Sequence, residues 1–259
     1  MNLPAGLAGA RRMIEDGFFE LFPCDAMFGM HNAPGVPEGQ FAVVPGFAMA
    51  SSDTCVIKVR GIGGHGAMPH KAVDPVVAGA AVVMALQTIV SRNVPPLHTG
   101  IVTVGAFLAG DAPNVIPGVA ELRLTVRAYK PEVRDLLQRR ITEIVHAQAA
   151  VFGATAEVDY QRRYPMLYNH PQETAFCEAV VRDWLGDAGL HADEPVTGSE
   201  DFSFFLEKVP GCYVFIGNGE GEQGGCMVHN PGYDFNDACL STGASYWVRL
   251  AESWLEPAQ

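Results

Sequence analysis

The sequence predicts an α/β protein in which a ferredoxin-like α+β domain, residues 54–165, is inserted into a partial α/β domain made of residues 1–53 and 166–259. Within 54–165 the apolar periodicities follow the order β-α-β-β-α-β, which is the order of a split ferredoxin-like unit with both helices on one face of the sheet. The flanking residues add helices and buried strands, but only about three strands, where five or six are typical of a sheet. We therefore expect the missing strands to lie upstream.

Composition restricts the function classes. Of the 259 residues, 48% are hydrophobic and 18% are charged, which is ordinary for a soluble globular protein. The net charge of −12 argues against a nucleic-acid partner, because phosphate binding requires clustered Lys and Arg. Pro4, Arg11 and Arg12 interrupt any apolar run that could act as a secretory signal, and the acidity fits the cytoplasmic location that we expect. The apolar stretch Pro75–Ser91 is shorter than the roughly 20 residues that span a bilayer, so we expect a buried helix and no membrane contact.

The sequence contains six cysteines, none of them in a Cys-x-x-Cys pair, so neither a zinc ribbon nor a thioredoxin-like motif is indicated. We expect reduced thiols that behave mostly as small buried side chains. These residues are Cys24, Cys55, Cys177, Cys212, Cys226 and Cys239.

The amino-terminal outer segment predicts a helix at Leu7–Phe19 and a short apolar strand at Ala26–Met30 that ends at His31. A second apolar stretch at Phe41–Met49 is broken by a Pro-Gly pair. The inserted domain follows with strands at Cys55–Arg60, Thr99–Phe107, Val119–Tyr129 and Ala156–Tyr160, and with helices at Asp74–Val90 and Pro131–Phe152.

The carboxy-terminal outer segment contains a predicted capping box. Thr197-Gly-Ser-Glu200 fits this motif and is expected to open a helix at Asp201–Glu207, so we expect these carboxylates to serve mainly in capping. The other predicted elements are a helix at Gln172–Trp184, a turn at Gly189, a strand at Cys212–Ile216, a glycine-rich loop at Gly217–Gly225 and a closing helix at Leu240–Leu255.

Two histidines lie where α/β proteins often place functional groups. His31 directly follows an apolar strand, and ligands collect at the carboxyl ends of such strands. His229 lies in a loop rich in turn-forming residues before the last helix. Taken alone, each fits a metal ligand, but each also fits an ordinary histidine bonded to a neighbouring carbonyl or exposed on a surface loop.

A further pair, His65 and His70, lies in a glycine-rich connector. The pair could bind a metal, one of them could stabilise an oxyanion or bind substrate, or the segment could be a plain connector. The run lacks both the dinucleotide fingerprint and Gly-Lys-Ser/Thr, so it is not a phosphate loop. The absence of a Gly-x-Ser-x-Gly elbow leaves a serine hydrolase without support.

Taken together, these motifs resemble the aminoacylase/hippurate hydrolase family, in order and over nearly the whole chain. The motifs are Gly9-Ala-Arg-Arg-Met-Ile-Glu-Asp-Gly17, Cys24-Asp-Ala, Met30-His-Asn, His65-Gly-Ala-Met-Pro-His70 with Asp74-Pro75, Asn114-Val-Ile-Pro117, Arg163-Tyr-Pro165 with Asn169, Gly198-Ser-Glu-Asp-Phe202, and His229-Asn with Asp234.

This resemblance implies a zinc-peptidase-like catalytic domain that carries two divalent metal ions, usually zinc, manganese or a similar ion, and an inserted dimerisation or lid domain. His31 and His229 match two histidine ligands of that metal site. His65 matches a lid histidine that, in related enzymes, reaches a partner subunit's active site and polarises the scissile carbonyl. Asn114 matches a polar lid position near bound substrate. The resemblance thus implies a homodimer that hydrolyses N-acyl amino acids.

One departure from the family pattern concerns the remaining ligands. In the family, a Cys-x-His ligand pair and a Glu-Glu pair precede the segment that matches Gly9–Gly17. Here only Met1–Leu7 precedes it, and no Cys-x-His occurs anywhere in the sequence. We therefore expect an amino-terminally truncated amidohydrolase that is weakly active or inactive alone.

Two alternatives remain open. The first is a non-catalytic dimerising or ligand-binding remnant of such an enzyme. The second is that a separately encoded fragment supplies the missing half of the site.

Overall fold

The computed structural model describes residues 9–255, and its contacts divide the chain into two compact units, each of which is described by itself. The first unit comprises Met49–Met166 with Thr197–Glu200, and the second comprises the described residues 9–48, Leu167–Val196 and 201–255. The segment Met1–Leu7, on which the expected truncation rests, lies outside the described residues, as does the expected start of the first helix at Leu7.

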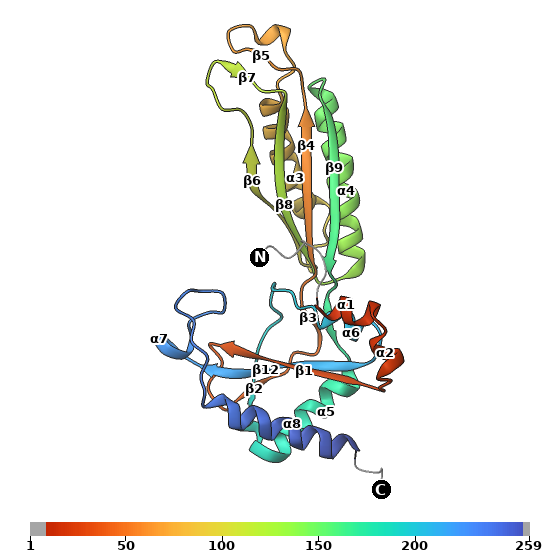
Figure 1. Ribbon diagram of the computed structural model, residues 1–259, viewed down its shortest axis with the longest axis vertical. Coiled ribbons are helices and arrows are strands. Elements are labelled where there is room, and N and C mark those ends of the chain that lie inside the picture. Colours follow the sequence, from red (N-terminus) through yellow and green to blue (C-terminus); the bar gives the residue numbers. More distant parts are fainter. Residues whose placement is uncertain (1–8, 256–259) are drawn as a thin grey trace. The chain divides into compact units, whose positions relative to one another are not determined.

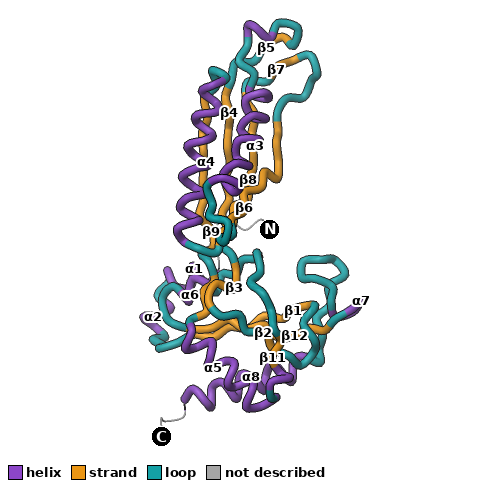
Figure 2. The backbone as a smooth tube through the Cα atoms, turned by 180° about the vertical axis from the view of Figure 1, so that it is seen from behind, coloured by secondary structure: helices purple, strands orange, loops and turns teal. Residues whose placement is uncertain are grey.

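The first unit is built on an antiparallel sheet with the strand order β6-β8-β4-β9. In chain order its elements run β-α-β-β-α-β, which confirms the predicted order, and α3 and α4 lie on one face of the sheet (Figures 1 and 2). The elements are β4 (Ser52–Arg60), α3 (Pro75–Arg92), β6 (Gly100–Leu108), β8 (Val119–Ala128), α4 (Pro131–Val151) and β9 (Thr155–Tyr164).

The core of this unit lies between the sheet and the two helices. Alternate residues of β4 point toward the helices, so Cys55, Ile57 and Val59 are buried, while the residues between them are half-buried and Arg60 at the end of the strand is exposed. They pack with residues of α3 and α4 such as Leu86 and Leu137, both fully buried. The apolar alternation in the sequence thus specifies which face of the sheet receives the helices.

Helix α3 is the one helix among the described residues that is long and apolar enough to cross a membrane. Its first turn is capped by Asp74, whose carboxylate accepts hydrogen bonds from the amides of Val76 at 2.8 Å and Val77 at 3.4 Å. We expected a buried helix, and α3 is buried along the face that packs on the sheet, whereas Val77 and Met84 are exposed.

A buried ion pair joins the first residues of β4 to α4 in the first unit. Arg134 donates to both carboxylate oxygens of Asp53, at 2.9 and 2.5 Å, and the Tyr160 hydroxyl donates to the same carboxylate at 2.8 Å. Ser51 exchanges hydrogen bonds with the backbone of Ala128. These contacts attach residues 51 and 53 to the first unit, which begins at Met49, a few residues before the expected boundary at residue 54.

The second unit contains a sheet with the order β1-β12-β2-β11 and a short ribbon of β3 and β10. Strand β1 is parallel to β12, and the register pairs His31 with Phe215. The elements are α1 (Gly9–Glu15), α2 (Phe18–Leu21), β1 (Met27–Pro34), β2 (Phe41–Ala42), β3 (Gly46–Met49), β10 (Leu167–Asn169), α5 (Pro171–Leu185), β11 (Leu190–His191), α6 (Ser203–Leu206), β12 (Gly211–Gly219), α7 (Gly221–Gly224) and α8 (Cys239–Leu255).

The two faces of this second sheet are covered differently. Helices α5 and α8 lie on one face (Figure 1), where Cys212, Val214 and Ile216 of β12 are buried with Tyr246 of α8. On the other face, the ring of Tyr213 of β12 packs against Phe202, which in turn packs against Phe205 of α6. The residues of β12 alternate between these faces, as in any strand.

Three sequence-based expectations for the second unit are wrong in detail. The helix expected at Leu7–Phe19 is broken, because Gly17 adopts a left-handed conformation with φ of 90° between α1 and α2. The strand expected to end at His31 continues to Pro34, since its pairing with β12 continues.

The predicted capping box is also wrong. Helix α6 begins only at Ser203, and the residue before it makes no side-chain cap. The Asp201 carboxylate instead accepts a hydrogen bond at 3.0 Å from the amide of Ala10, in the first turn of α1, where a helix has unsatisfied N–H groups. The carboxylate therefore serves a different helix from the one that the sequence indicated.

Candidate functional site

His31 lies in β1 of the second unit, and the orientation of its ring determines which ring nitrogen carries a free lone pair. Its Nδ1 lies 2.6 Å from the carbonyl oxygen of Asn32. A carbonyl oxygen only accepts, so Nδ1 donates, and in the neutral ring Nε2 carries the lone pair. This is the tautomer of a histidine that binds a metal ion through Nε2 while a carbonyl orients the ring.

His229 lies in the segment between α7 and α8, here called the site loop (residues 225–238). The amide of Asn230 donates to the carbonyl of Met227 at 3.2 Å, which makes His229 the third residue of a tight turn. Among the described residues it is the one non-glycine residue with positive φ, at 67°. A side chain in this conformation strains the backbone, and such strain often marks functional positions.

The structure brings the site loop to the strand that carries His31. The Asn32 amide donates a short hydrogen bond to the hydroxyl of Tyr233 in the loop. Figures 1 and 2 show the loop on the side of the sheet away from α5 and α8. By alternation from Met30, which lies near Gly243 of α8, His31 projects to this same side.

His65 and Asn114 are neighbours within the first unit. His65 belongs to β5 (Gly64–His65), which pairs with β7 (Val115–Ile116), and the register places His65 opposite Val115. The amide of Gly66 donates to the carbonyl of Asn114 at 2.8 Å. Both candidate residues are exposed, so the ribbon of β5 and β7 presents an imidazole and an amide together.

The ring of His65 has the opposite tautomer from that of His31. The backbone amide of Ala67 donates to Nδ1 of His65 at 3.0 Å. Because Nδ1 accepts, the proton of the neutral ring lies on Nε2. His65 can therefore donate a hydrogen bond from Nε2, as a residue that polarises a carbonyl oxygen must do. His70, the other histidine of this connector, lies in the turn Pro69–Lys71.

The described residues fit only part of a two-metal centre. Among them, no group of three or more His, Cys, Asp or Glu side chains is arranged to hold a metal ion. Two neutral imidazoles lack the anionic ligands that dinuclear hydrolytic sites use to balance the charge of two dications. A complete dinuclear centre therefore does not fit these residues alone.

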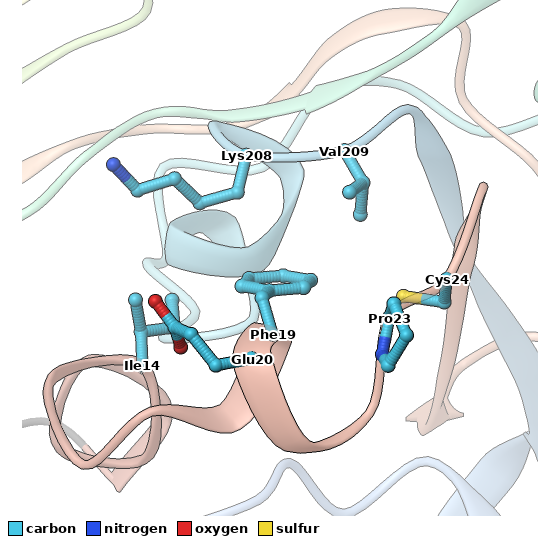
Figure 3. A pocket seen from close by; sticks show the side chains of 7 residues that line it. All are labelled: Ile14, Phe19, Glu20, Pro23, Cys24, Lys208 and Val209. Atoms are coloured by element: carbon cyan, nitrogen blue, oxygen red, sulfur yellow. The ribbon is translucent and has the colours of Figure 1, made fainter.

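A cavity of about 430 Å³ in the second unit lies elsewhere (Figure 3). Residues of α1 and α2 and of the segments after α2 and α6 line it, and none of the four candidate residues does so. Its lining residues are Ile14, Phe19, Glu20, Pro23, Cys24, Lys208 and Val209. We therefore do not assign this cavity to the candidate site.

The sequence did not single out the amide side chains near the site loop. Asn218, at the end of β12, is fully buried and contacts the loop, and Asn32 does so from β1. A signal was present, since this polar residue lies between Gly217 and Gly219, just after the predicted buried strand Cys212–Ile216. Buried amides in such places are normally hydrogen-bonded and so report a structural contact.

Comparison with solved structures identifies the architecture as that of metallopeptidase-like hydrolases. The Bacillus subtilis YXEP protein, whose structure is described as a dinuclear metal-binding peptidase of the M20 family, superposes with a TM-score of 0.78 at 29% identity, covering 97% of this chain and 62% of that one. A structure from methicillin-resistant Staphylococcus aureus gives a TM-score of 0.84 at 30% identity, covering 96% of this chain and 64% of that one.

The sequence profile of peptidase family M20/M25/M40 matches residues 4–253, and the chain belongs to this family. The resemblance to the aminoacylase/hippurate hydrolase family is thereby confirmed. Hippurate hydrolase of Campylobacter jejuni is 38% identical over 252 residues, 97% of this chain and 65% of the relative. N-acetylcysteine deacetylase of Bacillus subtilis is 35% identical over 250 residues, 96% of this chain and 63% of the relative. The chain thus spans less than two thirds of these relatives.

Proposed function

We propose that the protein is an amidohydrolase of the hippurate hydrolase type, which cleaves the amide bond of N-acyl amino acids. The observation that carries this proposal is the 38% identity with hippurate hydrolase along 97% of the chain. The similarity to a deacetylase of N-acetylcysteine supports the same substrate class, because both substrates are amino acids with an acylated nitrogen.

The proposed catalytic residue is His65, with Asn114 as a second polar group for the substrate. A carbonyl under attack gathers negative charge on its oxygen, and a positioned N–H donor stabilises that charge. The hydrogen bond from Ala67 to Nδ1 leaves Nε2–H of His65 free for this purpose. The resemblance supports action of His65 on the active site of a partner subunit.

The proposed metal ligands are His31 and His229, for zinc, manganese or a similar divalent ion. The Asn32 carbonyl supports this role for His31, because it fixes the tautomer that leaves Nε2 unprotonated. Among the described residues no third His, Cys, Asp or Glu side chain is grouped with these two histidines to hold a metal ion. A bound metal pair would supply an activated water and hold the amide oxygen.

The 259-residue chain alone should therefore hydrolyse such substrates very poorly or not at all. The test is to purify it, add manganese or zinc, and measure benzoate released from N-benzoylglycine. Turnover close to that of Campylobacter jejuni hippurate hydrolase, assayed in parallel, would show that the residues present suffice and would contradict the proposed incomplete site.

A dimerising remnant is the second candidate, and exposed apolar residues of the first unit support it. Strand β6 lies at an edge of its sheet, where Phe107 is 38% and Leu108 is 50% exposed. On α3, Met84 is 72% exposed. Unpaired strand edges and apolar patches are common sites of association between copies, so we propose a homodimer formed through this unit.

Sedimentation velocity tests the homodimer. A dimer that Leu108→Lys or Met84→Glu converts to a monomer is the expected result, with Val151→Glu, at another exposed apolar position of the same unit, as the matched control. A wild-type monomer at micromolar concentration would contradict the homodimer, and a monomer that also binds neither metal nor substrate would contradict the remnant hypothesis. We also propose a cytoplasmic location, which the six free thiols support, since reducing compartments keep thiols unpaired.

A further inference from the structure

The site loop that carries His229 is not held by apolar packing. From Gly225 to Ala238, every described residue is half-buried or exposed, whereas Gly224 and Cys239 on either side are buried. A segment of this length without buried side chains gains little from the hydrophobic effect and must be held by other contacts. Its conformation, including the strained backbone of His229, therefore depends on hydrogen bonds.

Asn218 supplies several of these bonds from a fully buried position at the end of β12. Its Oδ1 accepts from the amide of Asn236 at 2.9 Å. Its Nδ2 donates to the carbonyl of Asp234 at 3.2 Å and to that of Gly224 at 3.3 Å. One side chain thus joins the residue before the loop and two residues near its end to the same strand.

The amide of Asn32 completes the connection on the neighbouring strand. Its Nδ2 donates to the hydroxyl of Tyr233 in the loop and, at 3.4 Å, to Oδ1 of Asn218. Because Asn32 also provides the carbonyl that orients His31, one residue contacts both the candidate ligand on β1 and the loop with the other candidate ligand. The two histidine-bearing segments are joined through two asparagines.

We propose that Asn218 is a positioning residue of the candidate site, whose side-chain amide holds the site loop and thereby sets the place of His229 relative to β1. This role rests on the proposed function, in which His31 and His229 act together. An amide is required because the position needs an acceptor and a donor at once. Aspartate would keep the acceptor but direct an anion at two carbonyl oxygens, and alanine would leave all these groups unpaired.

Asn169 provides a matched control within the same unit. It is also fully buried, its Oδ1 accepts from the amide of Tyr213 at 2.7 Å, and its Nδ2 donates to the carbonyls of Val44 and Tyr213. None of these partners lies in the site loop. Asn169→Ala therefore removes a buried amide of similar hydrogen-bonding capacity without touching the loop.

The experiment is amide hydrogen exchange followed by NMR on the full 259-residue chain, with Asn218→Ala, Asn218→Asp and Asn169→Ala. The expected result is at least a tenfold faster exchange of the Asn236 amide in N218A, with the β4 amides of the first unit unchanged. In N218D the carboxylate still accepts from Asn236, so its protection persists, whereas the ring resonances of His229 shift as the carbonyl contacts are lost. N169A should leave both the Asn236 amide and the His229 ring as in the wild type.

Three outcomes would overturn the proposal: an unprotected Asn236 amide in the wild type, equal effects of N218A and N169A on it, or a His229 ring that is unchanged in both Asn218 variants. Circular dichroism and the β4 amides reveal any variant that fails to fold, and N218D then carries the test. Since exchange needs neither substrate nor metal, turnover by this chain close to that of the relative would contradict the proposed incomplete site and leave this result standing.

Discussion

The carbonyl oxygen of Asn32 lies 2.6 Å from Nδ1 of His31, and it fixes the proton of that ring on Nδ1. In His65 the amide of Ala67 donates to Nδ1, so the proton lies on Nε2. We predict that long-range ¹H–¹⁵N correlation spectra show opposite tautomers for the two neutral rings. The exposed His146 on α4 serves as a reference for an unconstrained ring. Identical tautomers for His31 and His65 would contradict the ligand and donor roles assigned to them.

Removing one partner of the buried ion pair between Asp53 and Arg134 should strongly destabilise the first unit. Asp53 is fully buried and accepts bonds from Arg134, Tyr160 and the amide of Arg163. We predict that Asp53→Ala costs about 3–5 kcal/mol in urea unfolding, because it leaves a buried guanidinium unpaired. Tyr160→Phe should cost only about 1 kcal/mol. The double variant D53A/R134A should lose less unfolding free energy than the two single variants lose together. Additive losses would argue against an interaction between the two side chains.

The free energy of unfolding at alkaline pH should depend on the thiol of Cys55. Burial, with a smaller contribution from the charge of Asp159, raises the pKa of this thiol from 9.0 to about 12. A raised pKa means that the stability gained by keeping the thiol protonated is complete below about pH 9 and is lost as the pH rises toward about 12. We predict that Cys55→Ala makes the fall in unfolding free energy over this range shallower. An unchanged slope would contradict the assigned burial.

The strained turn at His229 should make this histidine unfavourable for stability. A non-glycine residue at φ 67° strains the backbone by roughly 1 kcal/mol, and a β-branched residue there fares worse. We predict that His229→Gly is as stable as the wild type or slightly more so, whereas His229→Val loses at least about 1 kcal/mol. Urea midpoints measure both variants, and a glycine variant less stable than the valine variant would argue against strain.

The order of strands and helices in the first unit was predicted correctly from local sequence patterns. The alternation of Cys55, Ile57 and Val59 and the place of Pro75 in the first turn of α3 are properties of adjacent residues, so the order β-α-β-β-α-β could be inferred from the sequence. The second unit depends more on distant contacts. The carboxylate of Asp201 caps α1, which lies 191 residues away in the sequence, and no local motif could indicate this.

The candidate site was predicted through the motifs, and the hydrogen bonds around it were not. Composition and spacing left His31 and His229 open, and the resemblance gave them roles. Their surroundings depend on Asn32 and Asn218, which are 186 residues apart. Because an asparagine in a turn-rich sequence usually indicates only a turn, its buried role could be recognised only in the folded chain.

The most direct test of the central claim is a chimera in which this chain replaces the matched region of Campylobacter jejuni hippurate hydrolase, assayed for benzoate release from N-benzoylglycine with manganese or zinc. We predict hydrolysis that His31→Ala or His229→Ala each lower at least about 100-fold and that His65→Ala lowers by about 100- to 1,000-fold in kcat, while His146→Ala has no effect. A folded, metal-loaded chimera without hydrolysis, or one in which these three histidines can be replaced without loss, would contradict the claim that this chain carries part of an amidohydrolase site.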